Sequence, residues 1–252
     1  MNRSDYARAT KESASRLVDT YPKIAALPRD ARGLPIPANL ARDAQTGRPI
    51  FAGADLNKEI DLLCEGRCAV TGTKLETDDV WFVSAPDLAL SPFGMILDAP
   101  ICGEAKDFSL QVCPYLSVRN YQGLSGAQKD AITNNQGFDR VEKSVLPSRF
   151  VAVRVQGFNT TPTKTGMEYR PSRTYTRVEF WKEGILEQSL EGDAIKALLD
   201  EQYQRVKTMR PGAWPEWVHQ SIDGTLDGLW PWNTPGAKEI LLRMTLEAMS
   251  AR

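Results

Sequence analysis

Two stretches decide the fold: Arg67-Cys68-Ala69-Val70-Thr71-Gly72-Thr73-Lys74-Leu75 and, further along, Pro100-Ile101-Cys102-Gly103-Glu104-Ala105. Gly72 predicts a tight turn after Cys68, because glycine readily adopts the backbone conformations that such turns need. Cys102 stands directly before a helix expected over 104–112, which should stop at Cys113-Pro114 because proline restricts the residue before it. The sequence therefore predicts a turn that faces the start of a helix, with Cys68 and Cys102 close together.

The four cysteines of the chain all fall in this region, which makes them the candidate metal ligands. A zinc knuckle has the pattern Cys-x-x-Cys-Gly, but here Thr71 replaces the second cysteine. A structural zinc site needs four nitrogen or sulfur donors, so we expect too few donors for firm binding, and zinc is left open. The alternative is that the cysteines are reduced and pack as small buried hydrophobic residues. The candidate set is Cys64, Cys68, Cys102 and Cys113.

Several short motifs occur in a fixed order along the chain. They are Arg32-Gly33-Leu34-Pro35-Ile36-Pro37, Gly47-Arg48-Pro49, Cys68 to Gly72, Pro100 to Ala105, Cys113-Pro114-Tyr115-Leu116, and Arg177 to Glu183. This order resembles a family of uncharacterised phage and bacterial proteins with the pattern CxxCG, PxHxxC and CP(F/Y)L. The resemblance covers about residues 30–205 loosely, and Cys113 to Leu116 is its most specific part. It implies a host-directed or virion-accessory role, acting through protein–protein contacts.

This chain departs from the family pattern at three ligand positions. Thr71 and Ala105 stand where the family has cysteines, and Cys102 stands where it has a histidine. We therefore expect a degenerate treble-clef-like module, in which a knuckle faces a helix start without a complete set of metal ligands.

The predicted fold class is α+β: this module plus an antiparallel β-hairpin or sheet flanked by helices. The expected organisation is an N-terminal helix (1–30), the cysteine module (31–116), a polar loop (117–148), a β-hairpin and helix (149–208), and a tryptophan-rich tail with a helix (209–252). We expect these parts to form one compact unit, because 252 residues fit one large domain.

The predicted hairpin carries a candidate nucleic-acid surface. A strand over 150–155 and a longer one over 169–181 are expected, joined by a link over 157–166, because both segments are rich in β-forming residues. Arginines interleave with tyrosines on the longer strand, which suits phosphate contact and base stacking. The alternative is a solvated sheet face with cross-strand Arg–Glu pairs. The candidate residues are Arg170, Arg173, Tyr175 and Arg177.

The tail carries four of the six tryptophans, and they are the candidate partner-binding residues. Tryptophan is enriched in binding hot spots, so the tail is a candidate interface. The alternative is that these rings lock the tail onto the core. The residues are Trp214, Trp217, Trp230 and Trp232.

Catalytic residues are not predicted. A treble-clef nuclease needs a histidine in the module, whereas the single histidine, His219, lies near the other end of the chain. The acidic turn Glu76, Asp78 and Asp79 could hold magnesium but is typical of a solvated loop. Metal-dependent nuclease activity is therefore the least favoured function.

Composition favours a soluble binding protein. Hydrophobic residues make up 42% and charged residues 25%, as in globular proteins. The net charge of -1 argues against strong attraction to nucleic acid or anionic membrane. No apolar run is long enough for a membrane span, and the start lacks a signal-peptide core. We expect a cytoplasmic protein (host cytoplasm if phage-encoded) with a protein partner first and nucleic acid second.

Overall fold

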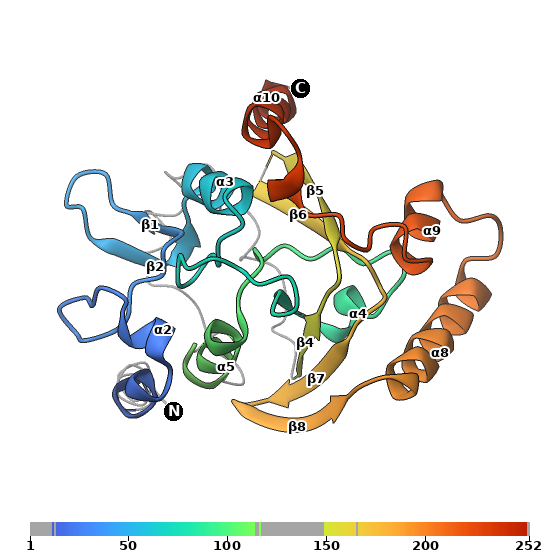
Figure 1. The fold of residues 1–252 in the computed structure, drawn as a ribbon, viewed down its shortest axis with the longest axis horizontal. Coiled ribbons are helices and arrows are strands. Elements are labelled where there is room, and N and C mark those ends of the chain that lie inside the picture. Colours follow the sequence, from blue (N-terminus) through green and yellow to red (C-terminus); the bar gives the residue numbers. More distant parts are fainter. Residues whose placement is uncertain (1–11, 13, 114–115, 117–148, 165, 251–252) are drawn as a thin grey trace.

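The computed structural model of the chain describes residues 12, 14–113, 116, 149–164 and 166–250. In this part, helices surround three small antiparallel sheets, so the α+β class is confirmed (Figure 1). Within the described ranges, no helix is long and apolar enough to cross a membrane. The polar loop expected over 117–148 lies outside the described residues, as do residues 1–11 of the expected first helix.

The largest sheet has four strands in the order β3-β4-β7-β8, and β3, β4 and β7 contribute buried residues to the core. The two smaller sheets pair β1 with β2 and β5 with β6. The strands are β1 (Leu40–Arg42), β2 (Pro49–Ala54), β3 (Trp81–Ser84), β4 (Phe150–Arg154), β5 (Phe158–Thr163), β6 (Gly166–Pro171), β7 (Arg177–Lys182) and β8 (Ile185–Leu190).

Helices cover these sheets and follow local sequence signals. Asp55 caps α3 by accepting backbone N–H bonds from Asn57 and Lys58, and aspartate is among the residues preferred at that position. The described helices are η1 (Val18–Thr20), α2 (Pro22–Ala25), α3 (Leu56–Cys64), α4 (Pro86–Ala89), α5 (Gly103–Val112), α8 (Asp193–Met209), α9 (Glu216–Ile222), η2 (Pro231–Asn233) and α10 (Ala237–Ser250).

The single long strand expected over 169–181 is wrong. The chain forms β6 up to Pro171, leaves the sheet, and enters β7 at Arg177. Ser172 and Arg173 cause the break, because Ser172 Oγ donates to Asp227 and the Arg173 guanidinium donates to the carbonyl of Gly94. These distant partners hold 172–176 away from strand geometry. The expected link over 157–166 is itself largely strand β5.

The expected antiparallel pairing is nevertheless present between β4 and β7, where Phe150 lies opposite Trp181. β8, which was not predicted, then pairs with β7 through the two-residue turn Glu183-Gly184, where both residues have positive φ. That turn type matches the twist of paired strands. The turn packs against the C-terminal part of α5, because a Cβ added at Gly184 would lie 3.5 Å from Gln111 Cα.

The core runs through the whole described chain, from Ala14 to Leu241. Its centre is aromatic: the Phe82 ring centroid lies 5.1 Å from that of Phe158 and 5.5 Å from that of Tyr169. The Tyr169 hydroxyl donates to the Glu59 carboxylate at 2.6 Å, so the polar end of this buried ring is satisfied.

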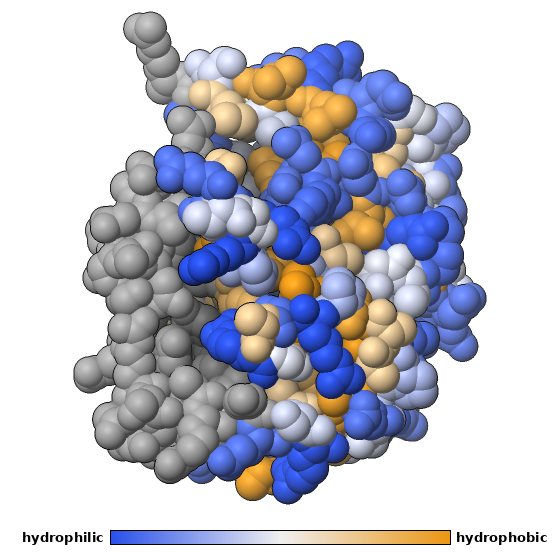
Figure 2. All heavy atoms as spheres, turned by 90° about the vertical axis from the view of Figure 1, so that its left-hand side faces the viewer, coloured by the Kyte–Doolittle hydropathy of each residue, from blue (hydrophilic) through white to orange (hydrophobic). Residues whose placement is uncertain are grey.

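The surface that carries β1, β2 and α2 contains both hydrophobic and hydrophilic side chains. Among the described residues there, hydrophobic groups are scattered between hydrophilic ones and form no single continuous patch (Figure 2). A scattered distribution is ordinary for a soluble protein surface.

Candidate functional site

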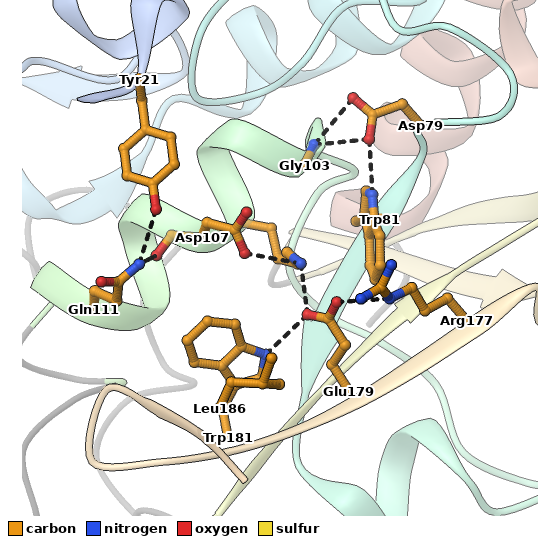
Figure 3. A pocket seen from close by; sticks show the side chains of 11 residues that line it. Tyr21, Asp79, Trp81, Gly103, Asp107, Gln111, Arg177, Glu179, Trp181 and Leu186 are labelled. Carbon is orange, nitrogen blue, oxygen red and sulfur yellow. Dashed lines mark hydrogen bonds and ion pairs between the residues drawn. The ribbon is translucent and has the colours of Figure 1, made fainter. Parts of the chain in front are cut away.

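An open pocket of ≈ 420 Å³ lies between α5 and strands β7 and β8 (Figure 3). Residues of α5 and β7 supply most of its lining. On α5, Gly103, Lys106 and Asp107 follow helical spacing and therefore share one face. On β7, alternate residues point to the same face of the sheet. The lining residues are Tyr21, Asp79, Trp81, Gly103, Lys106, Asp107, Gln111, Arg177, Glu179, Trp181 and Leu186.

A buried ion pair forms the floor of the pocket. Lys106 Nζ lies 2.5 Å from Glu179 Oε2, and each residue is 3% exposed. The Lys106 ammonium also lies 4.0 Å from the Trp81 ring centroid and 5.7 Å from that of Trp181. A buried charge is tolerated only when it is paired and hydrogen-bonded. The Lys106 ammonium is paired with the Glu179 carboxylate and also faces the two indole rings.

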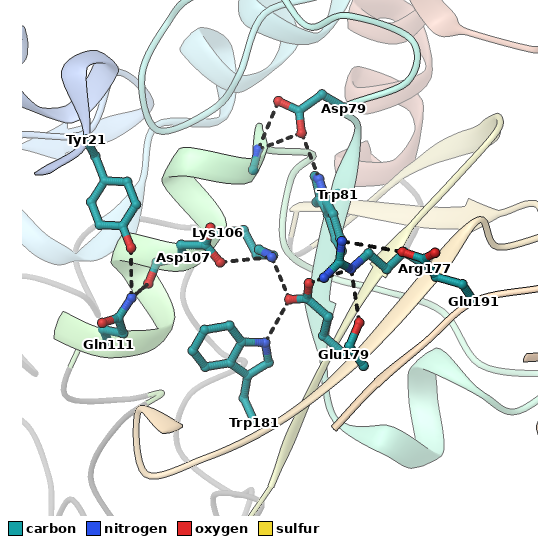
Figure 4. Close-up of polar contacts among 12 residues, drawn as sticks. Tyr21, Asp79, Trp81, Lys106, Asp107, Gln111, Arg177, Glu179, Trp181 and Glu191 are labelled. Carbon is teal, nitrogen blue, oxygen red and sulfur yellow. Dashed lines mark hydrogen bonds and ion pairs between the residues drawn. The ribbon is translucent and has the colours of Figure 1, made fainter. Parts of the chain in front are cut away.

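Glu179 is held from three directions (Figure 4). Besides Lys106, it accepts a bond from Trp181 Nε1 at 3.0 Å and pairs with Arg177 Nε at 3.0 Å. Arg177 also reaches Glu191, with Nη1 lying 3.4 Å from Oε1. This interlocked set fixes the side chains before any ligand arrives.

Two carboxylates flank the pair on the helix side. Asp79 accepts from the backbone N–H of Gly103 at 3.1 Å and from Trp81 Nε1 at 2.8 Å, so it holds both the helix start and the indole ring. Asp107 Oδ1 lies 2.9 Å from Lys106 Nζ. Burial raises the pKa of Asp107, and the neighbouring Lys106 charge only partly opposes this rise.

The predicted closeness of Cys68 and Cys102 is confirmed. Cys68 Sγ accepts backbone N–H bonds from Thr71 at 3.3 Å and from Cys102 at 3.4 Å, and Thr71 Oγ1 lies 3.8 Å from Cys102 Sγ. Burial opposes ionisation of Cys68, but hydrogen bonds from Cys102 and Thr71 outweigh it and lower the Cys68 pKa. The hydrogen bond to Cys68, together with burial, raises the Cys102 pKa.

The other two cysteines lie elsewhere. Cys64 ends α3 beside α10, and burial raises its pKa although the Lys238 charge opposes this rise. Cys113 is the C-cap of α5, so the ten residues of that helix separate it from Cys102 at the N-cap. In the described ranges, no three His, Cys, Asp or Glu side chains gather as a metal site. The donors around the Cys68–Cys102 pair therefore do not fit a four-ligand zinc ion. Glu76, Asp78 and Asp79 form no such group either.

The four hairpin residues do not share one surface. Arg173 and Tyr175 are buried, at 2% and 6% exposed, and bond to each other and to the backbone of Ala89. Arg177 lies in the pocket. Arg170 lies in neither place: its guanidinium carbon is 4.8 Å from the Trp217 ring centroid. A phosphate cannot reach the buried pair without displacing these bonds.

The four tail tryptophans divide into two groups. Trp230 and Trp232 stack with centroids 5.0 Å apart, and both meet Phe158 edge-on. Trp214 and Trp217 instead pack around Phe93, at centroid distances of 5.5 Å and 5.9 Å. All four thus contact aromatic rings of their own chain, and His219 lies exposed beside Trp214.

The sequence did not indicate Lys106 as a pocket residue, because its partner Glu179 lies 73 positions away. Phe93 was missed for the same reason. A local signal for the strand side is the alternation of residues, which puts Arg177, Glu179 and Trp181 on one face of a strand. Comparisons of the chain with protein-family models, with curated proteins and with solved structures found no match.

Proposed function

We propose that this chain is a non-enzymatic binding protein, and that the α5–β7 pocket takes a lysine or arginine side chain of a protein partner. The observation that carries this proposal is the make-up of the pocket wall. It holds three carboxylates (Asp79, Asp107 and Glu179) against two cations, with the indole rings of Trp81 and Trp181 between them. Carboxylates and aromatic faces are the groups that hold organic cations.

Lys106 supports this assignment from within the chain. Its ammonium occupies a setting of two indole faces and two carboxylates, which is the chemistry proposed for the incoming side chain. Asp107 extends that setting toward solvent, because its side chain is 35% exposed. A second cation that docks at the mouth would gain an ion pair without breaking the buried one.

The interlocked charges favour binding over catalysis. A nucleophilic lysine needs an amine that is free to attack a substrate, whereas Lys106 Nζ is engaged by the carboxylates of Asp107 and Glu179. A rigid, pre-paired floor suits recognition, because it does not reorganise when a ligand arrives.

We infer that residues 31–116 are a treble-clef-like module in which hydrogen bonds replace the metal. The knuckle turn keeps its antiparallel bridge between Arg67 and Lys74, and Gly72 keeps its left-handed φ of 70°. The thiol pair joins this turn to the N-terminus of α5. The same helix then presents Lys106 and Asp107 to the pocket, so the module positions the proposed binding site.

Peptide titration followed by NMR tests the pocket assignment. Short capped peptides with a central lysine, arginine or glutamate are added to labelled protein, and the indole N–H signals of Trp81 and Trp181 are read. We expect the basic peptides to shift both signals and the acidic peptide to leave them unchanged. Asp107→Asn should weaken the affinity for the basic peptides about tenfold, which corresponds to about 1.4 kcal/mol.

Asp61→Asn is the matched control, because Asp61 pairs with Lys238 at 2.7 Å and does not line the pocket. It should leave peptide binding unchanged. Equal shifts from the acidic peptide, or no shift from any peptide at about 10 mM, a concentration that detects millimolar affinity, would contradict the proposal.

A further inference from the structure

Four buried side-chain atoms have no hydrogen-bond partner in the described part of the chain, and all four can donate. They are Arg170 Nε, Arg173 Nε, Tyr203 Oη and Trp214 Nε1. A buried donor without an acceptor costs about 1–3 kcal/mol, so such atoms call for a missing partner. Two of them, on Arg170 and Trp214, belong to one cluster of aromatic and arginine side chains.

This cluster, here named the Phe93 cluster, consists of Phe93, Arg170, Arg210, Trp214 and Trp217. The Phe93 ring meets Trp214 at an interplanar angle of 73° and Trp217 at 84°. Arg170 lies over Trp217, and the Arg210 guanidinium carbon lies 5.3 Å from the Phe93 centroid. Two arginines therefore each cover one ring.

Four separate parts of the chain supply these residues. Phe93 follows α4, Arg170 lies on β6, Arg210 is the C-cap of α8, and the tryptophans lie at the start of α9 or just before it. In Figure 1, α9 and the end of α8 stand on the opposite side of the molecule from α5. The Phe93 cluster is therefore distinct from the pocket that α5 lines.

The charge of the cluster is unbalanced. Arg170 and Arg210 each face an aromatic ring, neither forms an ion pair with another residue of the described ranges, and Arg210 is exposed. Phe93, Trp214 and Trp217 are each half-buried, so part of each ring remains accessible. Positive charge, unused donors and ring surfaces thus occur together.

We propose that the Phe93 cluster binds a nucleotide, with the base against the aromatic rings and the phosphate on Arg170 and Arg210. Aromatic and guanidinium planes stack on bases of any sequence, at about 1–3 kcal/mol per base, and arginine's planar fork matches phosphate oxygens. Trp214 Nε1, a buried donor without an acceptor, lies in the same cluster. The ligand chemistry is the same for a free nucleotide and for one unit of a single strand.

Fluorescence anisotropy of a labelled dT12 oligonucleotide, at about 50 mM salt where phosphate contacts are strong, tests this assignment on the full chain. We expect saturable binding that Arg210→Ala weakens at least about fivefold and that raised salt weakens further. Arg170→Lys keeps the charge but loses the planar stack, so it should also weaken binding. Arg243→Ala is the matched control, since Arg243 is exposed on α10 beside Glu247.

Unlabelled AMP and inorganic phosphate are then added as competitors. Competition by AMP identifies a free nucleotide as a sufficient ligand, whereas binding of dT12 without AMP competition identifies the single strand as the source. Competition by inorganic phosphate at the same concentration as AMP would refute base recognition. The proposal would also be refuted if neither dT12 nor AMP binds, or if Arg210→Ala binds dT12 as tightly as the unchanged protein. Because Arg210 is exposed, that variant should fold, and a circular dichroism spectrum checks this.

Discussion

The backbone N–H of Cys102 donates to Cys68 Sγ at 3.4 Å, which joins the turn at Cys68–Gly72 to the N-cap of α5. The two residues are 0% and 1% exposed, so this contact is sealed from water. It fixes where α5 begins and therefore where Lys106 and Asp107 point. A contact inside the cysteine module thus sets the geometry of the pocket.

Cys68→Ala should destabilise the protein by about 1–3 kcal/mol, because it leaves buried N–H donors of Thr71 and Cys102 without their acceptor. Urea denaturation gives the free energy of unfolding. Cys64→Ala is the control, since Cys64 is half-buried at the end of α3 and should cost less. Equal losses for the two variants would show that the sulfur acceptor at Cys68 has no special role.

Purified protein should contain far less than one zinc ion per chain. The thiol pair offers two soft donors, and a structural zinc site needs four. Elemental analysis with a free-thiol count measures this, and addition of a chelator should leave the melting temperature unchanged, because no folding energy comes from metal. One zinc per chain, lost together with stability on chelation, is the contrary result.

Breaking the Lys106–Glu179 pair on one side should cost about 3–5 kcal/mol, the usual loss when a buried charge keeps no partner. Glu179→Ala leaves the Lys106 ammonium between two indole rings, with only Asp107 as a counterion. The double variant Lys106→Met, Glu179→Leu should recover most of that loss. If urea denaturation finds the double variant as unstable as the single one, the cost comes from lost packing instead.

The raised pKa of Asp107 gives a pH dependence with a definite sign. Burial makes the folded state hold the Asp107 proton more tightly than the unfolded state, whose ordinary value is 3.8. Stability should therefore rise as pH falls from neutral through the folded pKa, and then level off below the unfolded one. Asp107→Asn removes this contribution.

The measurement is the unfolding free energy of the wild type minus that of Asp107→Asn, followed from neutral to acidic pH. This difference should shift in favour of the wild type on acidification. Asp43 supplies a contrast, because hydrogen bonds from Thr46 lower its pKa. Its contribution is present above its unfolded pKa and is lost as pH falls, so Asp43→Asn should show the opposite trend.

Local signals allowed much of this fold to be predicted, and tertiary contacts decided the rest. Gly72 predicts the tight turn after Cys68, and Asp55 is a favoured N-cap residue directly before α3, because each acts on its immediate neighbours. The separation of β6 from β7 could not be foreseen, since it depends on Arg173 reaching carbonyl groups 79 and 84 positions away. The pocket could not be predicted either, because Lys106 and Glu179 come into contact only when α5 packs on the sheet.

A substitution of Arg173 tests directly how much its contacts with distant parts of the chain stabilise the fold. Its guanidinium donates to the carbonyls of Ala89 and Gly94 and to the Tyr175 hydroxyl, and the residue is 2% exposed. Arg173→Lys keeps the charge but cannot reach three acceptors in a fork, so buried acceptors lose their donor. We expect a loss of about 2–3 kcal/mol, consistent with breaking a buried network.

Arg205→Lys on the exposed side of α8 is the matched control and should change stability by less than about 0.5 kcal/mol. The same Arg173 variant should leave any oligonucleotide affinity that the Phe93 cluster confers unchanged at temperatures where it remains folded, because a residue sealed inside the chain cannot contact a phosphate. A specific loss of oligonucleotide binding with intact stability would instead place Arg173 at the ligand, and the connector between β6 and β7 would then have to open.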